Sequence, residues 1–297
     1  MTDTAHAAVT PGHRYVRYDA AAAKEQFGRR AFKLEHDLAG HPLFTLDALA
    51  ELAERLPQEH IEHNAGNRDV VVADNDALPQ AAMSPADIVR AIEDRPGFVA
   101  LPTTVPGVPR QSGYQELFEA ILDDLAPMID GGRAKIHDHH AVIFVASGGN
   151  TTPSHVDPEP SFLLHVRGVK KFSIGRYPDA DTEHRELEAF YRHEGRNTPL
   201  VPVDLEHFDL APGEALHVPP VTPHWVENGP EVAISFSVGF QTAEDHRRRG
   251  VYQWNSRVRR LGLTPAPYGS SEARDRLKGG VMQTAFEARR RLLRRPG

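Results

Sequence analysis

Hydrophobic positions in the first 132 residues alternate between helical and extended spacing. A helix is predicted after Thr45, a candidate N-cap, because leucines follow it at intervals of three and four residues. These leucines are Leu46, Leu49, Leu52 and Leu56. A second helix is predicted from Pro85, since proline is favoured in the first helical turn, and apolar runs predict short strands at 69–73 and 97–101. Residues 1–132 are therefore expected to form a mixed α+β region.

Strands dominate the pattern between residues 133 and 241. A turn is predicted at Ala211-Pro212-Gly213-Glu214, between the strands 208–210 and 215–218. Residues 181–192 are predicted to form a surface helix between the strands. The segments richest in Val, Ile and Phe, each bounded by Gly or Pro, are 134–147, 161–174, 208–218 and 232–240. Several short strands separated by turns predict an all-β core that is closed or sandwiched.

The last segment, residues 242–297, is predicted to form two helices separated by the breaker Leu263-Thr264-Pro265-Ala266-Pro267. From His246 onward it contains thirteen arginines and one lysine against three acidic residues, a net charge of +11. The rest of the chain must then carry −18 to give the total of −7. Apolar residues are interleaved with the arginines, so we expect the segment to pack on the acidic body of its own or a second subunit rather than to bind nucleic acid.

Composition describes an ordinary soluble protein, because 40% of the 297 residues are hydrophobic and 25% are charged. Cysteine is absent from the sequence, which excludes disulfides, thiolate zinc sites and cysteine nucleophiles. The sequence shows no signal-peptide pattern and no apolar run long enough to cross a bilayer. We therefore expect a cytoplasmic protein with no membrane partner.

Two histidines and one aspartate form the strongest candidate for a catalytic site. His155 and Asp157 are two residues apart, so in an extended strand both side chains project from the same face. His224 follows in a later strand, directly after a run that contains three prolines. Two imidazoles and one carboxylate are the ligands of a non-haem iron(II) oxygenase site, which keeps coordination positions open. The pattern predicts that His155, Asp157 and His224 bind one metal ion.

A second arrangement, His137-Asp138-His139, is the main alternative set of metal ligands. We rank it lower because no later motif supplies a further ligand for it. The chain has 17 histidines, and a lone histidine on a strand is usually an ordinary core or surface residue. That is the expected role of His165, His207 and His217.

The central third of the chain carries two linked motifs. Gly213, Pro219, His224 and Asn228 fit the second cupin motif, G-x5-P-x-G-x2-H-x3-N, except that Val221 replaces its middle glycine. Upstream, T-x2-H-x-D is followed by G-x-K, and P-P-x3-H later precedes the last strand. Together these motifs closely resemble the Jumonji-C branch of cupin-fold oxygenases, especially the bacterial cupin-like hydroxylases and the asparaginyl hydroxylase of hypoxia signalling.

This resemblance implies a mainly β fold with flanking helices: a double-stranded β-helix (cupin or jelly-roll) core at 133–241, an N-terminal α+β extension and a C-terminal helical appendage. It also implies that the two histidines and the aspartate bind Fe(II), while Lys170 and Thr152 bind the distal carboxylate of 2-oxoglutarate. A buried carboxylate needs such charged and hydrogen-bonding partners. Ser161 and Ser237 depart from the family, because they stand at or near positions where many members have asparagine.

The implied activity is that of an Fe(II)- and 2-oxoglutarate-dependent dioxygenase, a hydroxylase that uses O2 to oxidise an unactivated carbon. Its substrate would be a protein side chain, a peptide, an amino acid or a small metabolite, and the lack of zinc-binding cysteines argues against a histone demethylase. The helices of 242–297 resemble the dimer-forming appendage of related hydroxylases, which implies a homodimer. Two alternatives stay open: a metal-dependent cupin enzyme that does not use 2-oxoglutarate, and a catalytically silent cupin that binds or regulates.

Overall fold

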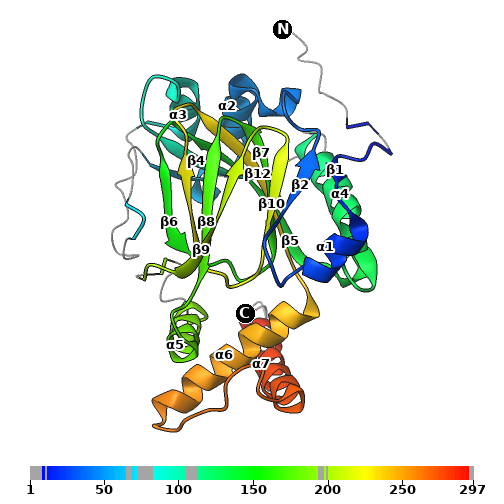
Figure 1. Ribbon diagram of the computed structural model, residues 1–297, viewed down its shortest axis with the longest axis vertical. Helices are drawn as coiled ribbons and strands as arrows, with labels where there is room; N and C mark the ends of the chain where they lie inside the picture. The colour runs from blue at the N-terminus through cyan, green and yellow to red at the C-terminus, as the bar shows by residue number, and fades with distance from the viewer. Residues whose placement is uncertain are drawn as a thin grey trace.

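Two antiparallel β-sheets form the centre of the molecule, with helices beside, above and below them (Figure 1). The computed structural model describes residues 9–10, 12–64, 69–71, 83–104, 113–192, 197–198 and 200–293, and it describes 287–293 by their backbone alone.

The larger sheet contains eight strands, and every neighbouring pair in it is antiparallel. They are β1 (Val16–Arg17), β2 (Phe32–His36), β3 (Glu62–Asn64), β4 (Phe98–Pro102), β5 (His137–Ala146), β7 (Ser161–Arg167), β10 (Glu214–Val218) and β12 (Ala233–Gln241). Their order across the sheet is β1-β2-β10-β7-β12-β5-β4-β3. The four N-terminal strands therefore extend the core sheet at both of its edges.

The smaller sheet has four strands in the order β6-β11-β8-β9, all antiparallel to their neighbours. They are β6 (Thr151–His155), β8 (Lys170–Arg176), β9 (Val203–Leu210) and β11 (His224–Asn228). From β5 to β8 and from β9 to β12, successive strands alternate between the two sheets, as in a double-stranded β-helix. The predicted mainly β fold with this core is confirmed.

The single strand expected at 161–174 is in fact two strands, β7 and β8, which belong to different sheets and are joined by a tight turn. Gly168 has φ +83°, and a Cβ at this position would lie 2.6 Å from the carbonyl oxygen of Val232. Glycine adopts such a positive φ without strain, and it also has no side chain to clash with this carbonyl group. The turn ends β7, sends the chain into the other sheet and makes Lys170 the first residue of β8.

Of the four N-terminal helices, three follow a residue whose side chain caps the first turn. The helices are α1 (Ala20–Gln26), α2 (Leu46–Arg55), α3 (Pro85–Ala91) and α4 (Tyr114–Leu125). Thr45 and Ser84 accept hydrogen bonds from the amides of Ala48 and Asp87, so the predicted start of α2 at Thr45 and of α3 at Pro85 are both confirmed. Of the strand expected at 69–73, residues 72–73 lie outside the described residues and 69–71 have no regular secondary structure.

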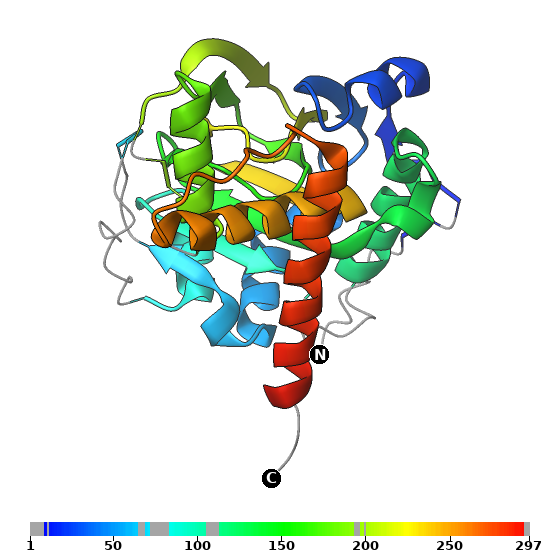
Figure 2. The ribbon, with the colours of Figure 1, turned by 90° about the horizontal axis from the view of Figure 1, so that it is seen from below.

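Three helices lie below the sheets: α5 (Ala180–Phe190), α6 (Ala243–Arg260) and α7 (Glu272–Leu293). Seen from below, α7 (red) crosses α6 (orange) (Figure 2). The crossing depends on glycine, because a Cβ on Gly250 would lie 2.8 Å from the Cα of Gly279. None of the described helices is both long and apolar enough to cross a membrane.

Buried apolar side chains form three clusters. The largest joins the eight-stranded sheet to α2, α3 and α4, and the second fills the space between the two sheets. The third, which we call the aromatic cluster, lies among the segment after β6, the end of β8, α5 and α6. Its members are Val156, Tyr177, Leu187, Tyr191 and Tyr252.

Three buried histidines make the fold sensitive to acid. His36, His165 and His217 are all at most 3% exposed, and burial lowers their pKa values to about 4, about 3 and about 3. The unfolded chain takes up protons on these imidazoles below pH ~6.5, whereas the folded chain does not. The contribution of these three histidines to the unfolding free energy is therefore fully present above that pH and is lost as the pH falls towards 4.

In urea unfolding of the metal-free protein, we expect each of these histidines to lower the unfolding free energy by about 1.4 kcal/mol per pH unit between pH ~6 and ~4. In the folded protein His217 Nε2 accepts a hydrogen bond from the Gly28 amide, and Nδ1 contacts the Ser161 carbonyl oxygen. His217→Gln should make the slope shallower by one histidine's share. An unchanged slope in this variant would contradict the assignment.

Candidate metal centre

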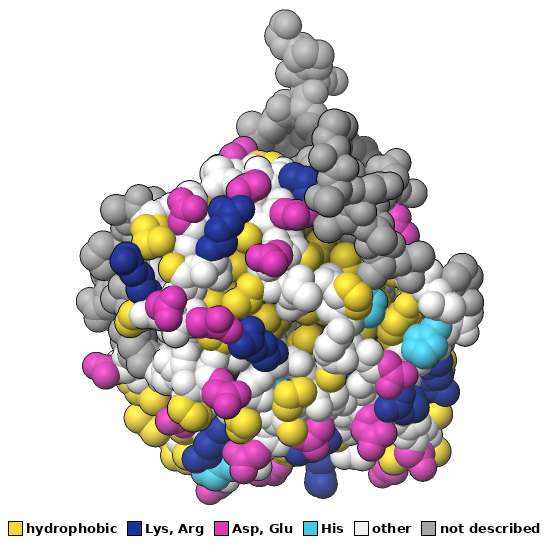
Figure 3. Space-filling view, turned by 90° about the horizontal axis from the view of Figure 1, so that it is seen from above, with side chains coloured by type: hydrophobic (Ala, Val, Ile, Leu, Met, Phe, Trp, Pro, Cys, Tyr) yellow, Lys and Arg dark blue, Asp and Glu magenta, His cyan; other side chains and the backbone are white. Residues whose placement is uncertain are grey.

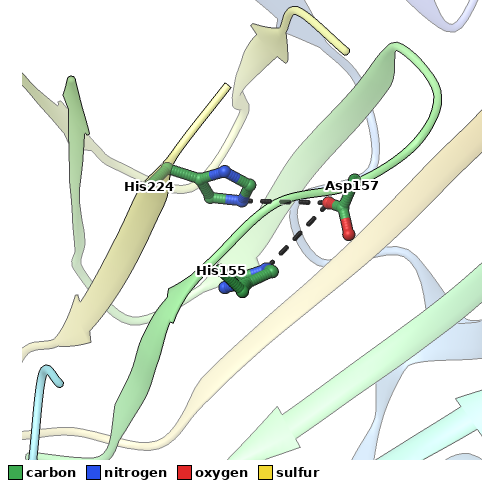
Figure 4. A group of neighbouring side chains, drawn as sticks. All are labelled: His155, Asp157 and His224. Atoms are coloured by element: carbon green, nitrogen blue, oxygen red, sulfur yellow. Dashed lines mark ion pairs between the residues drawn. The ribbon is translucent and has the colours of Figure 1, made fainter. Parts of the chain in front are cut away.

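The pairing of β6 with β11 brings the candidate metal ligands together. His155 is the last residue of β6, His224 is the first residue of β11, and the two stand opposite each other in the antiparallel register. Asp157 follows β6 by two residues, and its carboxylate points towards both imidazoles (Figure 4). Asp157 thus lies beyond the end of the strand, yet its carboxylate faces the same side as both imidazoles, as the spacing of H-x-D predicted.

The ligand atoms are close enough to hold one ion between them. Asp157 Oδ2 lies 3.8 Å from His224 Nε2 and 4.0 Å from His155 Nε2, and the two imidazole centroids are 4.2 Å apart. The histidine side chains are 6% and 4% exposed and the aspartate side chain is 26% exposed. Within the described residues, no other group of three His, Asp or Glu side chains brings its ligand atoms within 4.8 Å of one another.

Backbone carbonyls fix the orientation of both rings. His155 Nδ1 lies 2.7 Å from the carbonyl oxygen of Pro153, and His224 Nδ1 lies 2.9 Å from that of Thr222. A carbonyl oxygen only accepts, so each Nδ1 carries the proton and each Nε2 presents a lone pair on the side of Asp157. Metal-binding histidines almost always donate their other ring N–H in this way.

All five site residues predicted from the sequence line one cavity of about 390 Å³. The triad and Thr152 contribute to its wall, and Lys170 is the only lysine or arginine among the described residues that line it. Apolar side chains from both sheets, including Phe144, Leu163 and Phe172, line it as well. The cavity therefore combines a candidate metal site with a single buried cation.

Lys170 is buried without an opposite charge. It is 5% exposed, and within the described part of the chain its ammonium group has no ion pair or hydrogen bond. Burial lowers the pKa of Lys170 to about 7, because an ammonium ion is poorly solvated there. Lys171, the next residue, is exposed on the other face of β8, as alternation along a strand requires.

Several cavity residues were not singled out by the sequence. Asn228 stands opposite Lys170 in the β8–β11 register, and its Oδ1 is buried with no hydrogen-bond partner in the described structure. Its place in the cupin motif was the available signal. Glu159 is 3.5 Å from His140 Nε2 and accepts a hydrogen bond from Gln241, and burial raises its pKa to about 7. Ser161 and Ser237, the two departures from the family pattern, also line the cavity.

The alternative ligand set lies elsewhere. Asp138 is 3.4 Å from His246 and His139 is 3.8 Å from Glu119, and neither residue lines the cavity. The remaining strand histidines contact protein groups, as expected: His165 Nδ1 lies 3.0 Å from Ser235 Oγ, and His207 Nδ1 lies 2.9 Å from Ser173 Oγ.

Removing the aspartate tests the candidate triad directly. We expect Asp157→Ala to weaken Co(II) binding by at least about a hundredfold, because a lost ligand should cost more than the ~10–100-fold typical of outer-shell changes. Calorimetric titration measures the affinity, and far-UV circular dichroism should show the fold unchanged. Asp138→Ala is the matched control from the alternative set and should bind Co(II) like the unaltered protein. The reverse pattern would move the metal site to that set.

One protein-family model and several solved structures are similar to this chain. A family model of the JmjC domain matches residues 130–247. Solved structures with a similar fold include Escherichia coli ycfD (16% identity, TM-score 0.48, covering 92% of this chain and 69% of that chain). Another structure, YcfD in complex with cobalt and 2-oxoglutarate, is described as a ribosomal oxygenase (16% identity, TM-score 0.48, 92% and 67%). A third is a 2OG-Fe(II) oxygenase family oxidoreductase from Burkholderia pseudomallei (13% identity, TM-score 0.44, 76% and 92%).

No curated protein matches the sequence. The family match covers the β-strands that carry the triad, Lys170 and Thr152. The JmjC family model therefore matches the same part of the sequence whose motifs predicted this family.

Proposed function

We propose that this protein is an Fe(II)- and 2-oxoglutarate-dependent oxygenase that hydroxylates an unactivated carbon of a small-molecule, peptide or protein substrate. The observation that carries the proposal is the single cavity in which a two-histidine, one-carboxylate cluster and a buried lysine without an opposite charge occur together. A group of metal-binding side chains alone would fit many cupin enzymes. The additional buried cation calls for an anionic co-substrate.

The triad fits Fe(II) by its donor set. His155, Asp157 and His224 would hold the ion, and three protein ligands leave positions for 2-oxoglutarate and O2. The bound iron supplies the oxidising chemistry, in which 2-oxoglutarate is converted to succinate and CO2 and one oxygen atom enters a C–H bond of the substrate. The protein's own part is to orient both imidazoles through the Pro153 and Thr222 carbonyl groups, so that each Nε2 would face the ion.

Lys170 and Thr152 are proposed to bind the distal carboxylate of 2-oxoglutarate. An unpaired ammonium group in a buried site is costly, and a carboxylate at hydrogen-bonding distance would offset that cost. Binding an anion also favours the charged form of the lysine, so its pKa should rise from about 7 in the complex. The apolar side chains in the cavity wall, such as Phe144 and Phe172, would reduce the access of water to the reacting groups.

The C-terminal helices are proposed to form a homodimer. Large apolar side chains with exposed fractions between 44% and 77% lie on α7 and in the segment that leads to it. They are Leu261, Leu263, Leu277, Val281 and Phe286. The basic charge of this segment complements the acidic remainder of a second copy. The opposite face of the molecule instead mixes acidic and basic side chains (Figure 3).

Anaerobic titration tests the catalytic proposal. Fe(II) is added to the apo protein, then 2-oxoglutarate, while visible absorbance is recorded. We expect a weak metal-to-ligand charge-transfer band, because a 2-oxoacid bound to Fe(II) through two oxygens absorbs in the visible range. Iron binding without the band would favour a cupin enzyme that does not use 2-oxoglutarate. Failure to bind iron would favour a catalytically silent cupin.

Lys170→Met tests the co-substrate site separately from the metal. Losing one partner of a buried charge pair costs about 3–5 kcal/mol, so 2-oxoglutarate affinity should fall by about a hundredfold or more while Co(II) affinity is retained. Lys171→Met is the matched control on the exposed face and should leave both affinities unchanged. Equal losses in the two variants would contradict the assignment of Lys170.

Light scattering coupled to size-exclusion chromatography tests the homodimer. We expect a mass twice the 32.9 kDa of one chain. Leu277→Asp places a charge on the exposed apolar face of α7 and should shift the protein to monomer. Val169→Asp, in the exposed β7–β8 turn, is the control and should remain dimeric. A monomer in the unaltered protein would refute the proposal.

A further inference from the structure

Val221 has a backbone conformation that its side chain disfavours. Its φ is +51°, in the left-handed region, where a β-branched residue is a genuine outlier. Among the described non-glycine residues only Asp138 and Asp204 also have positive φ, and neither is β-branched. Val221 follows Pro220 in a turn, a position at which glycine is normal when φ is positive. It also replaces the middle glycine of the second cupin motif.

The backbone of this turn joins the two segments that carry the triad. The Val221 amide donates a hydrogen bond of 2.7 Å to the carbonyl oxygen of Asp157. The next residue, Thr222, supplies the carbonyl oxygen that holds His224 Nδ1 at 2.9 Å. A change in the conformation of Val221 would therefore act on the aspartate and on the second histidine at once.

The side chain of Val221 packs against the aromatic cluster. Val156, which lies between His155 and Asp157 and is 3% exposed, belongs to the same cluster. Tyr252 contributes from α6, and its ring stacks on that of Tyr191 with centroids 5.7 Å apart. Val156 thus belongs to the cluster and Val221 packs against it, so both triad-bearing segments contact a cluster to which α6 contributes.

We propose that Val221 is a positioning residue that couples α6 to the metal ligands through the aromatic cluster. The packing of its side chain holds the turn in the left-handed conformation, which directs its amide to Asp157. A strained backbone conformation persists only where the surrounding structure over-determines it, and here the cluster does so. Glycine would relieve the strain but would let the turn take up other conformations. This inference rests on the proposed metal-binding role of the triad.

The test measures Co(II) binding to the full-length apo protein by calorimetry and by the visible bands of the bound ion. We expect Val221→Gly to bind Co(II) about tenfold more weakly, the lower end of the ~10–100-fold range for outer-shell changes, and to alter the bands. Its thermal unfolding midpoint should be unchanged or higher. Asp204→Gly is the matched control, because Asp204 also has φ +51° but pairs with the exposed Arg176 and does not line the cavity.

A double-mutant cycle tests the route through the cluster. Val221→Ala keeps a β-carbon but removes the two methyl groups, and Tyr252→Leu changes the cluster on α6. Each substitution alone should weaken Co(II) binding. The double variant should bind Co(II) about as well as the single variant with the lower affinity, because both substitutions act through one contact surface.

Co(II) affinities within twofold of the unaltered protein in Val221→Gly and Val221→Ala would overturn the positioning role and leave the proposed function standing. Additive losses in the cycle would overturn the coupling through α6. Absence of Co(II) binding in the unaltered protein would overturn this inference and the proposed function together.

Discussion

The register between β6 and β11 is the constraint on which the candidate active site depends. His155 stands opposite His224 only in the observed pairing, and side chains alternate between the two faces of a strand. A slip by one residue would turn one imidazole away from the cavity and place a neighbour there instead. The pairing is irregular directly after His224, where the register shifts before Val226. The register shift therefore lies between His224, which belongs to the triad, and Val226, which pairs with Thr152.

The cavity also shows how a protein can keep a destabilising group in its core. Lys170 is fully desolvated, yet it begins a strand whose backbone is paired on both sides, with β11 and β9. The backbone hydrogen bonds and the apolar cluster between the sheets hold the strand in place whether or not the ammonium group has a partner. A site of this kind exchanges some stability of the free protein for affinity towards an anion, as functional sites often do.

The local parts of the site could be predicted from the sequence, because short motifs determine them. The spacing of H-x-D was enough to predict that His155 and Asp157 share one face. The helix caps Thr45 and Ser84 were predictable for the same reason, because each forms its hydrogen bond within one turn. The family motifs then predicted the double-stranded β-helix and the part of the chain that the JmjC family model matches, and Thr152 and Lys170 do line the cavity beside the triad.

Features that depend on long-range contacts could not be predicted from the sequence. Residues 161–174 were predicted as one strand, because a run of β-forming residues conceals the turn at Gly168 that carries the chain from one sheet to the other. The aromatic cluster joins α6 to the segment after β6, nearly one hundred positions earlier in the chain, and no periodic pattern encodes such a contact. The sequence shows that valine replaces the motif glycine at position 221. The consequence of this replacement became clear only from the φ of Val221 and the hydrogen bond of its amide to Asp157.

One consequence concerns the outer edge of the smaller sheet, where β6 lies. Proline at position 153 has no amide hydrogen to offer to an additional strand. The Ser154 amide is bonded to Val70, and its carbonyl oxygen accepts a hydrogen bond from Thr198, so two loop segments cover this stretch. An extended polypeptide therefore cannot lengthen the sheet beside the metal-binding motif. A peptide bound at this site would have to be recognised through contacts with its side chains and not by pairing with the backbone of β6.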